Sequence, residues 1–309
     1  MNPANGRPRL ATVTVAYNEP DKLGSWRKYY EAVRDEIDLH IIVDDGSATD
    51  YFKAVQAAFP ESILLSNPVN RGLIASYNVG FQYALRVEAQ YIGTFAPDFR
   101  LLPGTMRMLC RALDATPDID GIMPVVLKSG TNEVIESLGA RLDSRRAALV
   151  PYTKHARWNS DWTGIQPVDT MHGGCHLLRR TVLERIGLQN ERMFMYADEV
   201  DFGWRAKQAG LKFGVLLNAL AWHEHVNSGG ATRPAMAAYL VSRNRMLVMR
   251  SYGSTASFLM LAAVRGLMLV PAMVGYYRRE GTLRHAWAYA LGLFHGILGV
   301  TGPPPKFLL

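Results

Sequence analysis

Short apolar runs alternate with amphipathic stretches along roughly the first hundred residues. Four of these runs have the length of β-strands: 10–17, 38–45, 62–67 and 89–96. Three stretches between them have the spacing of helices: 21–33, 50–59 and 72–86. This alternation predicts an α/β fold with a parallel sheet and helices on its faces. Right-handed crossovers would bring the carboxyl ends of the strands to one edge, where such sheets bind ligands.

The rest of the chain changes character twice. Helices are predicted at 180–187 and 197–210, each ending at a glycine, and a strand is predicted at 213–221. From about residue 235, three long apolar stretches are rich in Ala, Leu and Met: 236–252, 256–277 and 283–300. The pattern therefore predicts a mixed α/β region followed by a helical C-terminal region.

Composition indicates a globular protein with an uneven charge. Of the 309 residues, 49% are apolar and 20% are charged, which is typical of folded domains. The net charge is +7, yet nine Lys and Arg face a single acid, Glu280, from Arg233 onward. A basic charge confined to one end suggests a local partner, of which anionic lipid is the first candidate.

The cysteines and the start of the chain favour a reducing compartment. Cys110 and Cys175 have neither metal-ligand spacing nor the pattern of a disulfide framework. Residues 1–9 are polar and contain no apolar signal segment, so we expect no secretory leader. A cytoplasmic protein is the expectation.

Polar side chains follow the predicted strands at the point where each strand ends. They are Tyr17, Asn18 and Glu19, then Asp44 and Asp45, then Asn70 and Arg71, and finally Asp98. Carboxylates, amides and a guanidinium suit a ribose, a base and a diphosphate. Each segment alone also has an ordinary interpretation, as a turn or a helix start. Their shared position at one sheet edge predicts a binding site there.

The order of short motifs adds a family resemblance. VAYNEP, VDDGS, NRGLIASYNVG, APD, GGCHLLRR, DEVDFGWR and WHEH follow one another with the spacing of family 2 glycosyltransferases of the GT-A fold. Over residues 10–230 the chain resembles bacterial rhamnosyltransferase-like enzymes of surface polysaccharide synthesis. The resemblance implies a mostly parallel central sheet with flanking helices and a C-terminal helical region.

The resemblance also implies a reaction and a division of the chain. A hexose, with rhamnose as one candidate, would move with inversion from a nucleotide diphosphate sugar to a hydroxyl of a glycan or polyprenyl-linked acceptor. We expect a catalytic domain over 1–235, with a nucleotide-binding half (10–120) and an acceptor-binding half (121–235), and apolar, basic helices over 236–309. A thymidine diphosphate donor is favoured, a uridine donor stays open, and no nucleic-acid partner is expected.

On the donor side the resemblance assigns one pocket. Its expected residues are Tyr17, Asn18, Glu19, Asp44, Asp45, Asn70, Arg71 and Asn78. Asp44 would hydrogen-bond the base, Glu19 would lie near the ribose, and Arg71 would lie near the diphosphate. A helix N-terminus after residue 72 would favour the same anion.

A divalent metal, Mg²⁺ or Mn²⁺, is expected through Asp98 and His223, with His225 as a weaker candidate. The family usually carries Asp-x-Asp at this point, and Ala96 replaces the first acid here. That departure keeps open a second interpretation, a catalytically impaired sugar-nucleotide-binding or scaffold protein. A nucleotidyltransferase is the less favoured alternative, because VAYNEPDK lacks the glycines of its phosphate loop.

The general base is expected in the segment Asp198-Glu199-Val200-Asp201. Alignment on Arg205 assigns Glu199 as the base and Asp201 as its helical partner, with Asp198 as the fallback base. Most relatives carry Asp at the base position, so Glu199 is a departure. Acids in the first turn of a helix also stabilise it through the helix dipole, which is the structural alternative.

The acceptor side is expected around a small-residue loop. Its expected members are Gly173, Gly174, His176 and Trp158, with His172 and Trp162 as further candidates. Glycines would let the backbone approach a sugar closely. Cys175 is not expected to act as a nucleophile, because a single displacement needs none.

The C-terminal helices are expected at a membrane surface. The stretch 256–277 is long enough to span a bilayer, but Arg265 lies near its centre and Pro271 would kink it. Together with the basic Arg278, Arg279 and Arg284, this favours helices lying on the cytoplasmic face of the inner membrane. The alternative is a helical bundle packed on the catalytic domain or on a second subunit of a homo-oligomer.

Overall fold

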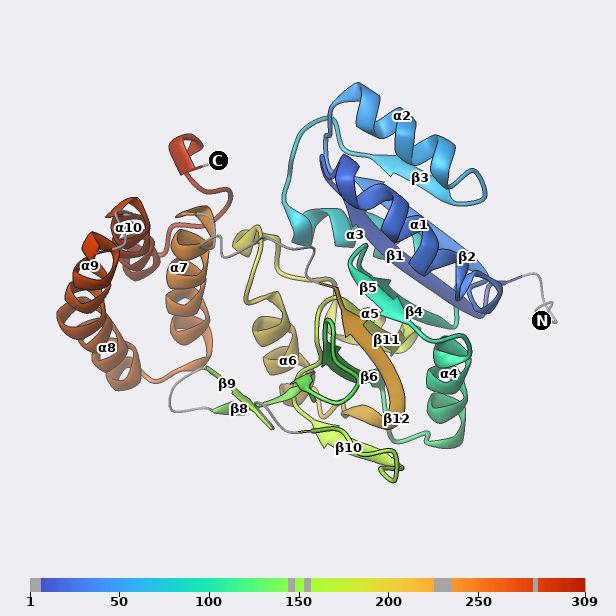
Figure 1. Cartoon of the computed structure of the whole chain (residues 1–309). Coiled ribbons are helices and arrows are strands. Elements are labelled where there is room, and N and C mark those ends of the chain that lie inside the picture. The colour runs from blue at the N-terminus through green and yellow to red at the C-terminus, as the bar shows by residue number, and fades with distance from the viewer. Residues whose placement is uncertain (1–6, 144–147, 153–156, 225–234, 280–282, 309) are drawn as a thin grey trace.

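A ten-stranded mixed sheet forms the centre of the protein, shown in Figure 1. The structure, a computed structural model, describes residues 7–143, 148–152, 157–224, 235–279 and 283–308. The first four strands are β1 (Leu10–Ala16), β2 (Leu39–Asp44), β3 (Ile63–Ser66) and β4 (Tyr91–Phe95). β1 pairs in parallel with β2 and β4, and β2 pairs in parallel with β3. The predicted parallel arrangement is confirmed, and all of β1 is buried because helices cover both faces.

Helices connect these strands as the pattern predicted. They are α1 (Leu23–Glu31), α2 (Thr49–Ala58) and α3 (Leu73–Arg86). A further helix, α4 (Thr105–Ala115), follows the short strand β5 (Phe99–Leu101) and was not among the predicted elements. α3 packs on β1 and β2, whereas α4 packs on the second half of the sheet.

The second half of the sheet contains antiparallel pairs. Its strands are β6 (Gly121–Lys128), β7 (Ile135–Ser137), β10 (Ile165–Val168), β11 (Cys175–Arg179) and β12 (Phe213–His223). β11 runs antiparallel to both β4 and β6, so it joins the two halves. β12 runs parallel to β6, with an irregularity between Leu216 and Leu220, and its last residue pairs with Phe99 of β5. This register brings the end of β12 beside the end of β4.

The remaining elements frame the second half. They are the small sheet of β8 (Ala140–Asp143) and β9 (Ala148–Pro151), the helices α5 (Arg180–Ile186) and α6 (Asp198–Gln208), and the 3₁₀ turns η1 (Pro20–Lys22), η2 (Arg34–Glu36), η3 (Glu191–Met193) and η5 (Lys306–Leu308). α5 and α6 correspond to the two helices predicted between residues 180 and 210, and α6 follows directly on a short loop after η3.

The C-terminal region is a group of helices beside α6 (Figure 1). It contains α7 (Ala235–Tyr252), α8 (Thr255–Val264), the π-helical turn η4 (Arg265–Leu269), α9 (Val270–Arg279) and α10 (Leu283–Leu298). Of the described residues, one stretch, Thr255–Tyr276, is long and apolar enough to cross a membrane. α7 packs along α10 and also contacts α6, so this region is packed on the part of the chain that contains α6.

Glycines allow α7 and α10 to approach each other closely. A Cβ on Gly292 would lie 2.2 Å from the backbone oxygen of Tyr239, and one on Gly296 would lie 2.6 Å from that of Arg243. Both distances are shorter than any real contact, and backbone cannot move aside as a side chain can. Glycine at these positions therefore sets the distance between the two helices.

Gly292→Ala is expected to destabilise the protein by about 1–3 kcal/mol, because the added methyl group must force α10 away from α7. Gly275→Ala in α9 is the matched control, since nothing lies within 4 Å of its Cβ position. That change should be neutral or stabilise by up to about 1 kcal/mol, because alanine favours a helix. Thermal unfolding followed by circular dichroism checks both, and equal melting temperatures for the two variants would contradict the packing argument.

Candidate active site

The end of β2 provides two buried carboxylates with different surroundings. Asp44 accepts a hydrogen bond at Oδ2 from the backbone N of Ser47 (3.1 Å), while its buried Oδ1 has no partner among the described residues. A buried carboxylate oxygen without a partner is costly unless a ligand supplies a donor. Asp44 therefore offers an acceptor at the place where the sequence predicts a base.

Asp45 acts within the protein itself. Its Oδ1 accepts from the backbone N of Arg71 (2.8 Å) and the side chain of Asn67 (3.0 Å), and its Oδ2 accepts from the backbone N of Gly72 (2.9 Å). Both oxygens are thus used in fixing the loop before α3. Gly72 is required there, because its φ of +92° is left-handed and a Cβ would lie 2.5 Å from Phe194.

The loop after β1 is tied to the loop after β2. The backbone N of Asn18 donates to Ser47 Oγ (3.1 Å), and Asn18 Oδ1 accepts from the backbone N of Ala48 (2.9 Å). Glu19 pairs with Lys22 (2.5 Å), and Tyr17 is exposed. The expected donor-side residues of these two loops are therefore adjacent, with Tyr17 and Glu19 open to solvent.

Three other expected donor residues lie near α3. Asn70 accepts from the backbone N of Gly72 (3.0 Å) within its own loop. Arg71 pairs with Glu191 (3.2 Å), with both side chains partly exposed at the rim. Asn78 is buried and bonds to the backbone O and N of Gln189 (2.9 Å each), so it joins α3 to the loop before α6 and its amide does not face the donor pocket.

A cluster of carboxylates and imidazoles lies where β12 ends beside β4. Nε2 of His223 is 3.3 Å from Asp98 Oδ2, and its Nδ1 is 2.7 Å from Glu136 Oε1. Ligand atoms of Glu136, His172 and His223 all lie within 4.8 Å of one another. Oxygen and imidazole nitrogen are ligands of Mn²⁺ and related divalent ions. This cluster fits a divalent cation, and Glu136 supplies a carboxylate where Ala96 does not.

The protonation of this cluster follows from its contacts. Burial lowers the pKa of His223, but the hydrogen bonds to Asp98 and Glu136 outweigh it and raise that pKa to about 9. Burial raises the pKa of Asp98, and the contact with His223 more than reverses this. Burial lowers the pKa of His172 to about 4, so this imidazole is neutral near neutral pH.

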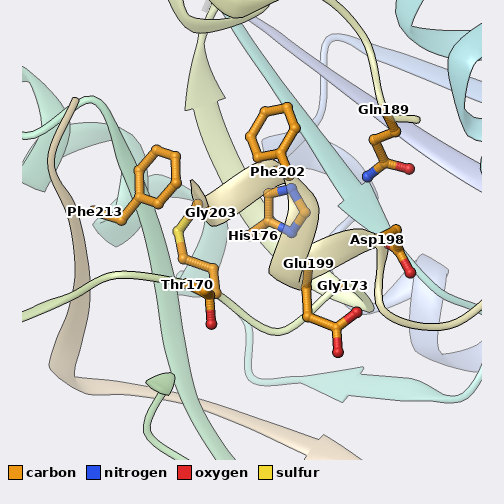
Figure 2. Close-up of a pocket in the computed structure, with 10 residues that line it drawn as sticks. Thr170, Gly173, His176, Gln189, Asp198, Glu199, Phe202, Gly203 and Phe213 are labelled. Atoms are coloured by element: carbon orange, nitrogen blue, oxygen red, sulfur yellow. The ribbon is translucent and has the colours of Figure 1, made fainter. Parts of the chain in front are cut away.

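The start of α6 carries the expected base. Glu199 and Asp198 line a small pocket with Gly173, His176 and Gln189, among others (Figure 2). Burial and the neighbouring carboxyl of Asp198 raise the pKa of Glu199 to about 8, and burial raises the pKa of Asp198 as well. Two close carboxyls that share an enclosed site cannot both ionise easily. One of them is therefore able to exchange a proton near neutral pH.

Asp201 lies one turn into α6 and faces the protein interior. Its carboxylate accepts from Arg205 (2.9 Å), Asn190 (3.1 Å) and the hydroxyl of Tyr252 in α7 (2.8 Å). The side chain is 2% exposed. These three donors make Asp201 a residue that positions α6 and leave it no path to an acceptor.

A strained loop precedes the expected base. Phe194, Tyr196 and Ala197 have φ values of 64°, 68° and 63°, a region that costs a residue with a side chain about 1–3 kcal/mol. Met195 N also donates to Met193 O (2.7 Å), which closes a tight γ-turn around Phe194. Such backbone persists only when its surroundings hold it.

Two α7 residues hold this loop. Asn244 Nδ2 donates to the carbonyls of Met193 (3.0 Å), Met195 (2.8 Å) and Tyr196 (2.9 Å). Arg243 donates to Met193 O (3.0 Å) and to Asn244 Oδ1 (3.0 Å). Both side chains are fully buried. The C-terminal helices therefore set the approach of the chain to Glu199.

The loop 172–176 connects the metal cluster to the base. His172 stands beside His223, with ring centroids 5.5 Å apart, and a Cβ on Gly173 would lie 3.8 Å from Asp198. Gly174 is needed for packing, because a Cβ there would lie 2.3 Å from Phe99. His172, expected on the acceptor side, is thus placed in the metal cluster.

The other expected acceptor residues have protein partners. His176 is buried and bonds to Thr94 (3.1 Å) and to the carbonyl of His172 (3.0 Å), and burial lowers its pKa to about 4. Trp158 donates from its indole to Leu217 O (2.8 Å), and Trp162 packs with it against the core. His225 lies outside the described residues.

Carboxylates from distant parts of the chain act on one buried tyrosine. Tyr77 of α3 is buried between them: burial raises the pKa of its hydroxyl, and the charges of Asp98 and Asp198 raise it further. Asp98 is in turn within electrostatic reach of Lys22, the partner of Glu19. The cation cluster and the start of α6 therefore lie close together, with the loop after β1 within electrostatic reach of Asp98.

Sequence reasoning missed Glu136, Arg243 and Asn244. Glu136 is an isolated acid on a short strand, and nothing in its neighbourhood in the sequence marks it as a ligand. Arg243 and Asn244 lie inside a long apolar helix, where buried polar residues can signal a fixed partner. The sequence therefore contained this signal, but it did not identify the residues that these side chains contact.

Solved structures of low sequence identity share this architecture. GalNAc-T7, solved with UDP, GalNAc and Mn²⁺, matches with a TM-score of 0.59 at 16% identity, over 80% of this chain and 48% of its own. The mannosyltransferase PcManGT of Pyrobaculum calidifontis, solved with GDP-Man and Mn²⁺, matches with 0.51 at 15%, over 93% and 87%. The fold is the GT-A fold of glycosyltransferases, as predicted.

Sequence relatives define the family. Residues 12–187 match the family described as "Glycosyl transferase family 2", and the chain belongs to it. The low-salt glycan biosynthesis hexosyltransferase Agl10 of Haloferax volcanii is 26% identical over 239 residues, 77% of this chain and 76% of its own. The N-acetylglucosaminyl-diphospho-decaprenol L-rhamnosyltransferase of Mycobacterium tuberculosis is 24% identical over 225 residues, 62% and 68% of the two chains. The protein is a glycosyltransferase that uses a nucleotide sugar, and the rhamnosyltransferase-like resemblance is confirmed.

Asn244→Ala is expected to lower the stability of the protein by about 1–3 kcal/mol, because the carbonyls of the strained loop lose their buried donor. The rate of proteolytic cleavage within 193–197 should rise by more than the lower global stability alone would cause. Asn159→Ala is the matched control: this exposed side chain bonds only to Asp161 N (3.0 Å) among the described residues, and its loss should cost about 0.5 kcal/mol or less. Denaturant unfolding and limited proteolysis measure both effects. Unchanged cleavage in Asn244→Ala would contradict the assigned role.

Proposed function

We propose that this enzyme transfers the sugar with inversion, in a single displacement assisted by a divalent metal, to a hydroxyl of a glycan or lipid-linked acceptor. The observation that carries the proposal is the proximity of two groups of carboxylates, because His172 of the cation cluster is followed by Gly173, whose Cβ position lies 3.8 Å from Asp198. Asp98 and Glu136 meet His223 in one group, and Glu199 has a raised pKa in the other. An ion site and a base that lie close together are what a single displacement requires.

On the donor side, Asp44 is proposed to bind the base. The free, buried Oδ1 suits the ring N–H of uracil or thymine, which supports a uridine or thymidine diphosphate donor. Tyr17 is exposed beside it and can cover the base or the ribose. Asp45 and Asn18 hold the surrounding loops in place.

Asp98, Glu136, His172 and His223 are proposed to hold Mg²⁺ or Mn²⁺. When bound there, the cation would neutralise charge on the diphosphate oxygens of the leaving nucleotide. Phe99 stacks on His223 with ring centroids 4.8 Å apart, which holds this imidazole in its orientation.

Glu199 is proposed as the general base. Its carboxylate takes the proton of the acceptor hydroxyl, and the oxygen forms a bond to the anomeric carbon from the face opposite the nucleotide. The bond from that carbon to the phosphate oxygen breaks, and its electron pair leaves with the nucleoside diphosphate. Burial and the neighbouring Asp198 keep the pKa of Glu199 high, close to the range in which a base is effective.

Glu199→Gln is expected to lower kcat about a hundred- to ten-thousandfold, because the acceptor proton loses its base. In the wild type, kcat/KM should rise with pH toward about 8, since Glu199 acts when deprotonated, and this dependence should be absent in the variant. Folding is checked separately. The pKa of Glu199 is raised in the folded protein, so the unfolded chain loses this proton at lower pH. Stability therefore falls as pH rises from the ordinary pKa of a glutamate toward about 8. Glu199→Gln, which cannot ionise, should melt no lower than the wild type at alkaline pH.

Glu184→Gln on α5 is the matched control for this change. Glu184 is a partly exposed acid that pairs with Arg180 (3.1 Å), and its loss should leave kcat unchanged. Initial rates with a nucleotide sugar and a soluble acceptor across neutral and mildly alkaline pH make the comparison. Near-full turnover by Glu199→Gln would reject this residue as the base.

Glu136→Gln is expected to weaken Mn²⁺ binding about tenfold or more, because the cluster loses one of its two carboxylates. Glu133→Gln is the matched control, since Glu133 lies three residues away and pairs with Arg157 at the surface. Isothermal titration with Mn²⁺ measures affinity, and removal of metal with EDTA should abolish transfer until Mn²⁺ is restored. Equal affinities for both variants would show that Glu136 is no ligand.

The proposed acceptor and location follow from the relatives and from the C-terminal surface. The mycobacterial relative is named for a decaprenol-linked acceptor and for rhamnose, which supports both for this enzyme. Large apolar side chains of α8, η4 and α9 are exposed, including Leu259, Leu267 and Met268. We place these helices on the cytoplasmic face of a membrane, with their apolar side in the lipid.

A further inference from the structure

Residues 299–308, which follow α10, return along α7 toward the start of that helix, and we call them the strap. In Figure 1 the strap is the red chain between α10 and the point marked C. Its neighbours on α7 change along its course from Arg250 through Arg243 to Tyr239. The strap thereby reaches the loop before α6, whose left-handed residues precede Glu199.

Gly302 of the strap bonds to both sides of the network that holds this loop. Its backbone O accepts from Arg243 Nη1 (2.6 Å), and its backbone N donates to Arg192 O (2.8 Å). Arg192 lies in η3, directly before the left-handed residues, and Arg243 also donates to Met193 O (3.0 Å). One glycine therefore ties the buried arginine of α7 to the loop. Without the carbonyl of this glycine, a buried guanidinium would lose an acceptor.

Leu308 of the strap packs on the apolar side of the same loop. It is 4% exposed and belongs to a buried apolar cluster with Phe194, Tyr239 and Leu240. Phe194 is the central residue of the γ-turn. The adjoining Phe307 is 56% exposed and stacks on Trp287, with ring centroids 5.2 Å apart. Adjacent residues thus face opposite ways, Leu308 toward the loop and Phe307 away from it.

We propose that the strap positions the general base: Gly302 and Leu308 hold the loop 193–197 so that Glu199 leaves it in the direction that proton transfer requires. The inference rests on the proposed role of Glu199. A base must reach the acceptor hydroxyl at hydrogen-bond distance, and a displacement of about 1 Å can cost about a hundredfold in rate. Both strap residues act through the loop and are therefore positioning residues.

The contacts of the strap distinguish this role from simple packing of α7 on α10. Those two helices meet directly, through Gly292 and Gly296. The strap instead donates to Arg192 O and packs in the cluster of Phe194, and both of these residues belong to the segment before α6. Left-handed residues with side chains persist only where their surroundings hold them. Loosening the strap should therefore release the loop before it releases the helices.

Leu308→Ala in the full-length protein tests the apolar contact, and Phe307→Ala is the matched control at the adjoining position. In Leu308→Ala, cleavage within 193–197 under native conditions should accelerate about tenfold or more, because the loop opens locally. The kcat of transfer, measured with the same nucleotide sugar and acceptor as for Glu199→Gln, should fall about tenfold or more. Phe307→Ala should change both by about twofold or less.

Two further readouts separate positioning of the base from general damage. The affinity of Leu308→Ala for Mn²⁺ should stay within about twofold of the wild type, because the proposed ligands of the cation lie outside the loop. Leu308→Met keeps the buried volume and should restore most of kcat. A parallel loss of Mn²⁺ affinity, or no rescue by Leu308→Met, would contradict the positioning role.

Gly302→Ala and Gly299→Ala test the polar contact independently. Both glycines have a left-handed φ, +89° and +80°, so alanine strains the backbone at either position. Of the two, Gly302 is the one that bonds to Arg192 and Arg243. Gly302→Ala should therefore accelerate the same cleavage and lower kcat, whereas Gly299→Ala should change both by about twofold or less. If Leu308→Ala unfolds globally, cleavage will rise throughout the chain, and this second pair decides.

Three results would overturn the proposal. If cleavage within 193–197 is no faster in Leu308→Ala and Gly302→Ala than in their controls, the strap does not hold the loop. If cleavage is faster and kcat is normal, the loop is held but does not position the base. If Glu199→Gln keeps near-full turnover, the base assignment fails and the positioning role fails with it. Failure of the strap alone is distinct, because Glu199→Gln then loses activity while Leu308→Ala keeps it.

Discussion

The site depends on the hydrogen bonds that Asn244 and Arg243 donate to the loop before α6. Three residues with side chains adopt left-handed backbone there, and one of them sits in a γ-turn. Left alone, this stretch would relax toward ordinary backbone, and the first turn of α6 would rotate with it. Fully buried donors on α7 instead bind its carbonyls, so the direction in which Glu199 leaves the chain is fixed by side chains more than forty residues later in the sequence.

The same loop also joins the donor half to the base. Phe194 touches the loop before α3 at the position where only Gly72 fits, and its carbonyl accepts from Ile74 N (3.3 Å). Asn78, one turn further along α3, binds the backbone of Gln189. Movement of the loop before α3, which is proposed to bind the nucleotide, would therefore reach Glu199, the proposed base, through direct contacts. In the structure the two halves are linked by packing contacts, whereas in the sequence they are only successive segments.

Local pattern explains why the sheet and the strand-end acids were predictable and part of the site was not. β1 to β4 are short apolar runs bounded by turns, so both their existence and their parallel order follow from the sequence. Asp44 and Asp98 were found because they end such runs. Glu136 meets His223 across 87 positions, and Asn244 meets Met195 across 49, so no local period reports either contact. α4 was not predicted, although its apolar positions recur with helical spacing.

Different sides of α7 face different surroundings, and the polar residues in its sequence reflect this. In an α-helix, residues two apart point to nearly opposite sides, so Arg243 and Arg245 cannot serve the same partner. Arg243 meets backbone carbonyls and Asn244, which satisfy a buried cation with dipoles alone. Arg245 is only partly buried, and its Nε has no hydrogen-bond partner among the described residues. One helix therefore carries a completed polar network on the side of Glu199 and an unsatisfied donor two residues further along.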